Sequence, residues 1–217
     1  MKSITKILSL FVLSLTLFSA HAQDYEAAMQ KGLALFNEAE NEEDLRNTAN
    51  HFERIGNMEN EKWLPKYYAA LCYVSMNWNM EDDDDKDAVL DQAEKLIETA
   101  QKSSENNAEL ILMMGYIKMA KLSVSPALRG PFMTPKVNAL FAQAVALDPE
   151  NPRAHCLKAR MDFGTASFFG SDISKPCSGA QKALELYEKE AQTARGIQPK
   201  WGKNIAQSLA NTCAKKQ

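Results

Sequence analysis

Glycine and proline are scarce in this sequence, with nine glycines and eight prolines among 217 residues. This scarcity excludes a collagen-like repeat and a low-complexity chain. Hydrophobic residues make up 45% of the sequence, which excludes a disordered chain and suits one globular unit or a small helical array. The net charge of −3 argues against a dedicated nucleic-acid binder.

The common catalytic and metal-binding motifs are also missing. The sequence contains no HExxH, CxxC or GxSxG motif and no glycine-rich phosphate loop. Beyond residue 22 the two histidines, His51 and His155, are about a hundred residues apart and have no metal-ligand spacing. We therefore expect no enzyme activity, no bound metal and no cofactor.

Residues 1–22 have the three-part pattern of a secretory signal peptide. Lys2 and Lys6 precede a short apolar run, and Ala20 and Ala22 supply the small residues of a cleavage site. The run of roughly 12 apolar residues is too short to span a bilayer, which needs about 20. The first cysteine is Cys72, so we expect no lipoprotein. We expect cleavage after Ala22, export to a periplasm, and a single domain over 23–217 that does not insert into a membrane.

Helical periodicity dominates after residue 24, and hairpin signals such as Asn-Gly or Asp-Gly are absent. The pattern predicts an all-α fold. The expected helices cover residues 25–39, 43–56, 62–79, 84–102, 107–123, 135–147, 151–165, 178–195 and 200–214.

One stretch carries a repeat signature. Val137, Phe141 and Ala144, followed by Leu-Asp-Pro149, resemble the second helix and closing turn of a tetratricopeptide (TPR) repeat. Weaker copies of the pattern occur at Ala93-Ile97-Ala100 and Thr48-Phe52-Ile55. Small residues recur where the first helices of that family need them, at Gly32, Ala70, Gly115 and Ala159. The resemblance implies a right-handed array of about four antiparallel helix pairs with a closing helix.

The predicted repeats are longer than the roughly 34 residues of a TPR. The extra residues fall within pairs, at 79–87, 123–134 and 164–178, and predict long loops along one edge. Candidate partner-binding residues there are Trp78, Arg129, Phe132, Phe168 and Phe169. The alternative is that these aromatic side chains fold back into their own core.

The resemblance also implies a concave groove lined by the first helices, with Tyr67, Tyr116, Arg153 and Arg160 as further partner-binding candidates. A TPR groove that clamps a peptide carboxylate uses Lys, Arg and Asn. The matching positions here lack the Asn, so the groove is better suited to an ordinary helix or extended segment.

The acidic run from Glu81 to Asp87, interrupted only by Lys86, allows two interpretations. It has neither the alternating ligands nor the glycine of an EF-hand loop, so a calcium site is disfavoured. A basic partner could dock there. We favour a solvated, mobile loop whose acids lie near the positive end of the next helix.

Four cysteines in an exported chain allow three complete pairings. Cys177 begins one predicted helix and Cys213 ends the next, and a short connection makes the two antiparallel. We therefore predict a Cys177–Cys213 disulfide and expect buried thiols at Cys72 and Cys156.

These observations favour an exported, non-enzymatic TPR-like module that binds an unknown protein or peptide through the loop edge and the groove. The alternative is a helical small-ligand-binding protein with Phe132, Phe168 and Phe169 around an apolar pocket under the loops.

Overall fold

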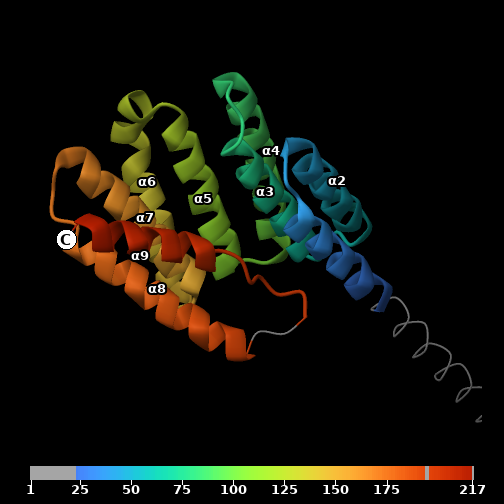
Figure 1. The fold of residues 1–217 in the computed structure, drawn as a ribbon. Helices are drawn as coiled ribbons and strands as arrows, with labels where there is room; N and C mark the ends of the chain where they lie inside the picture. Colours follow the sequence, from blue (N-terminus) through green and yellow to red (C-terminus); the bar gives the residue numbers. More distant parts are fainter. Residues whose placement is uncertain (1–22, 194–195, 217) are drawn as a thin grey trace, which may run out of the picture.

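The computed structural model describes residues 23–193 and 196–216, and every regular element in these ranges is an α-helix (Figure 1). The predicted signal peptide lies outside the described residues. A first helical stretch covers 23–38. The labelled helices are α2 (Glu42–Met58), α3 (Leu64–Asn77), α4 (Asp83–Ser103), α5 (Ala108–Val124), α6 (Pro126–Leu147), α7 (Pro152–Phe169), α8 (Ser174–Thr193) and α9 (Lys203–Lys216).

Consecutive helices pack as antiparallel pairs. Helices α3 and α4, α5 and α6, and α7 and α8 form three hairpins, and the stretch 23–38 pairs with α2. The first helices also contact one another in order, α3 with α5, α5 with α7 and α7 with α9. Their row forms one layer and the second helices form the other, so the chain folds as a TPR-like array closed by α9, as the sequence predicted.

Small residues on first helices accept aromatic rings from second helices. A Cβ atom added at Gly115 would lie 2.7 Å from the ring of Phe141, and one at Gly32 would lie 2.5 Å from the ring of Phe52. Both phenylalanines are fully buried. This close approach explains why the small and aromatic positions recur together in the sequence.

The prediction of long loops within the later helix pairs is wrong. The expected loop over 123–134 is mostly the start of α6, which begins at Pro126, and α7 extends to Phe169. Proline is well placed in a first helical turn, where its missing N–H has no helical acceptor. Pro131 and Pro135 lie further inside α6 but on its exposed side, where water can bond the carbonyls that they leave free. The extra length therefore forms taller hairpins.

The acidic run is likewise helical. Asp82 caps α4 by accepting hydrogen bonds from the backbone N–H groups of Asp84 and Asp85. The next three aspartates form the first turn, where carboxylates interact favourably with the helix dipole. The predicted loop is thus a capped helix start.

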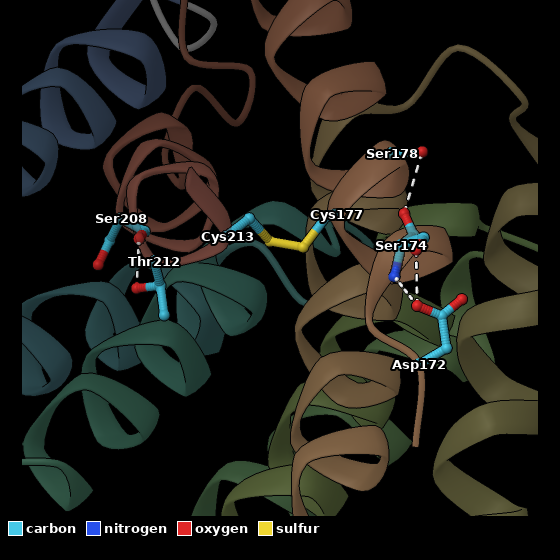
Figure 2. The surroundings of a disulfide bond; sticks show 7 residues. All are labelled: Asp172, Ser174, Cys177, Ser178, Ser208, Thr212 and Cys213. Carbon is cyan, nitrogen blue, oxygen red and sulfur yellow. Dashed lines mark hydrogen bonds between the residues drawn. A yellow bond between two sulfur atoms is a disulfide. The ribbon is translucent and has the colours of Figure 1, made fainter. Parts of the chain in front are cut away.

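The predicted disulfide between Cys177 and Cys213 is confirmed, with the two Cα atoms 5.7 Å apart (Figure 2). It joins the start of α8 to the end of α9 and so holds the closing helix against the array. The other two cysteines, Cys72 and Cys156, are buried free thiols, as expected. Burial raises the pKa of Cys156 to about 12.

Within the described ranges, none of the helices combines the length and the apolar character that crossing a bilayer would require.

Candidate binding surfaces

The concave layer of first helices is covered by the chain itself. The segment 196–202 precedes α9 and lies against the first helices α3 and α5 (Figure 1). Its Trp201 ring stacks on Tyr116 of α5 at 5.6 Å, and the indole Nε1 donates a hydrogen bond of 2.8 Å to the Tyr67 hydroxyl of α3. The Tyr68 hydroxyl donates to the carbonyl of Ile197 at 3.0 Å. The predicted groove is therefore already occupied by a non-helical segment of the chain.

A buried ionic network lies beneath this segment. The Arg153 guanidinium, at the start of α7, donates to Glu109 of α5 at 2.9 Å and to both carboxylate oxygens of Glu190 of α8 at 2.7 and 2.9 Å. Tyr67 donates to the other oxygen of Glu109 at 2.6 Å. Burial and the neighbouring Glu109 carboxylate raise the pKa of Tyr67, so its hydroxyl stays protonated and can donate. The network joins three repeats and is satisfied internally.

An aromatic stack extends from this network toward the tips of the hairpins. The Trp78 ring lies 6.4 Å from that of Tyr116 and its Nε1 donates to the Tyr116 hydroxyl at 3.2 Å. The Arg160 guanidinium lies 4.9 Å from the centre of the Trp78 ring, within cation–π range. Trp78 is 40% exposed, so the stack reaches the surface at this end.

These contacts correct the groove prediction. Tyr67, Tyr116 and Arg153 are 0%, 4% and 4% exposed and all bond within the chain, so no partner can reach them while segment 196–202 stays in place. Arg160 and Trp78 lie at the rim and stack on each other. Sequence reasoning missed Trp201 as the occupant and Glu109 as the acceptor. The flanking Gly196 and Gly202, both with positive φ, were the available signal for a tight non-helical passage.

Four large apolar side chains are exposed at the tips of the α5–α6 and α7–α8 hairpins. Leu128 and Phe132 lie one turn apart on α6, and Phe168 and Phe169 end α7; the four are 71–76% exposed. Phe132 is 15 residues before the end of α6 and Phe168 is 16 residues after the start of α7, so both lie about 23 Å from the turn that joins these helices. We call these four side chains the apolar edge. Sequence reasoning missed Leu128.

The aromatic rings of the apolar edge lie at the surface and do not plug the core. Phe168 and Phe169 contact each other edge to face at 5.1 Å. An open depression of about 420 Å³ occurs elsewhere, between the start of α7 and the end of α8. Its lining includes Glu150, Lys189 and Glu190, so it is not the apolar pocket of the alternative small-ligand interpretation.

Arg129 connects the apolar edge to the start of α4. Its guanidinium makes a two-point contact with the Asp87 carboxylate at 2.5 and 2.6 Å and donates to the Lys121 carbonyl at 2.8 Å. The hydrogen bond from Arg129 lowers the pKa of Asp87. Arg129 therefore positions α6 against α4, and its partly exposed side chain remains a predicted partner contact.

No group of three His, Cys, Asp or Glu side chains in the described ranges could hold a metal ion. The Nε2 atoms of His51 and His155 each lie 2.9 Å from a backbone carbonyl, of Ala28 and Pro149 respectively.

No protein-family model and no curated protein sequence matches this chain. Among solved structures, the haemophore HusA from Porphyromonas gingivalis aligns with a TM-score of 0.78 and 24% identity, over 89% of this chain and 94% of HusA. The two chains share a fold over almost their whole length.

Two weaker alignments were also found. MamA of strain RS-1, as the ArsTM double mutant, aligns with a TM-score of 0.47 and 16% identity over 79% of each chain. The thermophilic TPR protein TTC0263 from Thermus thermophilus aligns with a TM-score of 0.49 and 18% identity, over 90% of this chain and 93% of TTC0263.

Proposed function

We propose that the protein is an exported, non-enzymatic binding module that holds a protein or peptide partner on the apolar edge. The observation that carries this proposal is the exposure of Leu128, Phe132, Phe168 and Phe169 at the tips of two adjacent hairpins. Large apolar side chains gathered on one surface mark interaction sites. The groove contributes only through its rim, at Trp78 and Arg160.

The energetic argument favours the edge over the groove. A partner that covers the edge removes four large apolar side chains from water, each worth about 1–2 kcal/mol for the exposed part. It displaces no part of the chain. A partner in the groove must first displace Trp201 and uncover the Arg153 network.

Site-specific photocrosslinking tests the proposal. A photoreactive phenylalanine is placed at Phe132, Phe168 or, as a control, Met58, which is 75% exposed at the opposite end of the array. The full chain is expressed with its leader and irradiated in its own compartment. We expect a discrete crosslinked band at 132 and 168 and none at 58. Equal labelling at all three positions, or none at any, contradicts the proposal.

A flat, apolar small ligand is a second candidate, favoured by the adjacent rings of Phe168 and Phe169 and by the fold shared with a haemophore. We expect haem to bind here through ring contacts, because neither described histidine belongs to the apolar edge and both lie against backbone carbonyls. We therefore expect iron-free porphyrin and haem to bind equally if either binds. Fluorescence quenching in wild-type and Phe168→Ser protein measures this. Tighter binding of haem than of iron-free porphyrin would contradict this mode of binding.

A further inference from the structure

We infer that the partner of the apolar edge is a basic amphipathic segment, whose apolar face covers the edge and whose Lys or Arg side chains lie over the start of α4. The inference rests on the proposed function and adds the chemistry of the partner. It follows from the position of the acidic residues relative to the edge.

The first turn of α4 lies beside the apolar edge. Arg129 is flanked on α6 by Leu128 and, one turn later, by Phe132, and it holds Asp87 of α4 at 2.5 Å. Asp83 is also close enough to raise the pKa of Arg129. The acidic run and the edge are thus parts of one continuous surface.

This surface has an excess of negative charge at one end only. Glu81 and the four aspartates that follow are all exposed. Two of the nearby basic side chains have partners, Lys86 with Asp83 at 2.9 Å and Arg129 with Asp87, and one further basic residue, the exposed Lys136, follows Phe132 by one turn of α6. No described residue pairs with the Asp84 or Asp85 side chain. Near Phe168 the charges balance, with Asp172 and Lys175 at the start of α8. A partner with basic residues at one end of an apolar face complements this distribution.

The same charges argue against a membrane as the occupant. Exposed phenylalanines could enter a lipid interface, but proteins that bind such surfaces do so with Lys and Arg around the apolar face. Five acidic residues beside the edge would repel anionic headgroups.

Two synthetic amphipathic helical peptides test the inference. They share one Leu-rich face and length, and differ in having Lys or Glu on the polar face. Fluorescence anisotropy measures their binding to the purified full-length protein after leader removal. We expect the Lys peptide to bind at least about tenfold more tightly than the Glu peptide in 0.1 M salt. We expect most of that preference to disappear in 1 M salt, because the Debye length there is only about 3 Å and the attraction between exposed charges is screened.

Matched variants locate the binding. The variant Glu81→Gln, Asp83→Asn, Asp84→Asn, Asp85→Asn keeps the Asp82 cap and the Asp87 ion pair and should bind the Lys peptide about tenfold more weakly. Glu98→Gln with Glu105→Gln, which removes two exposed acids at the other end of α4, should change nothing. Phe132→Ser with Phe168→Ser should abolish binding of the Lys peptide, and Met58→Ser should not.

Each contrary result has a defined meaning. Equal binding of both peptides that is lost in the double Phe variant overturns the basic partner and leaves the apolar edge as a site. Binding that survives the double Phe variant, or no binding of either peptide, also overturns the inference, and photocrosslinking at 132 and 168 then decides the proposed function separately. Stronger binding to phosphatidylcholine–phosphatidylglycerol vesicles than to the Lys peptide would favour a membrane instead.

Discussion

Phe132 and Phe141 lie on the same helix, α6, and we expect their replacement by alanine to affect the free energy of unfolding very differently. Phe132 is 75% exposed, whereas Phe141 is fully buried against Gly115. A binding side chain that contributes nothing to the core can be removed without loss of stability. A core side chain such as that of Phe141 cannot be removed without a loss of stability.

The expected magnitudes follow from burial. Full burial of a phenylalanine is worth about 2–3 kcal/mol, so the quarter of Phe132 that is covered contributes about 0.5–0.8 kcal/mol. Alanine recovers about 0.5 kcal/mol through its higher helix propensity. Phe132→Ala should therefore leave the free energy of unfolding nearly unchanged. Phe141→Ala should lower it by about 3–5 kcal/mol, because a cavity remains.

Thermal unfolding followed by circular dichroism measures both changes. At about 2–4 °C per kcal/mol for a chain of this size, Phe141→Ala should lower Tm by roughly 10 °C and Phe132→Ala by less than about 2 °C. The Lys peptide should bind Phe141→Ala below its Tm as it binds wild type. A fall in Tm for Phe132→Ala that approaches that of Phe141→Ala would refute the reasoning, since Phe132 would then be a core residue.

Three further changes test the scaffold by urea unfolding. Replacing Cys177 and Cys213 with serine should lower the free energy of unfolding by about 3–4 kcal/mol, and a reductant should then have no further effect. Arg153→Met should lower it by about 3 kcal/mol, because two partly buried carboxylates lose their partner, and adding carboxylate-to-amide changes at both acids should restore part of the loss. Gly115→Ala should cost about 1–3 kcal/mol through overpacking, whereas Gly130→Ala, with open space around it, should stabilise by about 0.5–1 kcal/mol. Destabilisation of equal size at both glycines would contradict the packing argument.

The helices were predictable because their signals are local. Asn41, Asp82, Asn107 and Asn151 each cap a helix with a side-chain oxygen, and apolar periodicity extends to the end of each predicted helix. The Cys177–Cys213 pairing was predictable for a related reason, since it depends only on two helix ends and a short connection.

The start of α6 was not predictable from the same rules. Pro126 and Pro131 favour a loop when each is considered alone, and Pro135 favours a helix that begins only there. All three lie on the exposed side of the helix, and only the packing of the rest of α6 against α5 determines which side that is. A local rule about proline was overridden by a tertiary contact.

The closed groove was unpredictable because its contacts are distant in sequence. Trp201 and Tyr67 are separated by 134 residues, and nothing around either residue indicates the other. The family resemblance correctly placed Tyr67, Tyr116 and Arg153 on the first helices. It could not indicate that the connection before α9 would cover them.

The difference between groove and edge determines where a partner can bind. Displacing segment 196–202 would return Trp201 and Ile197 to water at a cost of about 3 kcal/mol or more, which reduces groove affinity by roughly a hundredfold. The disulfide adds to this closure, because it holds α9 in place immediately after the segment. The edge bears no such cost, since Leu128, Phe132, Phe168 and Phe169 are already exposed. Helical extension of α6 and α7, which lengthens each repeat beyond the usual TPR, is what raises these side chains above the core. The residues that made the repeats look irregular in sequence are therefore those that we expect a partner to contact.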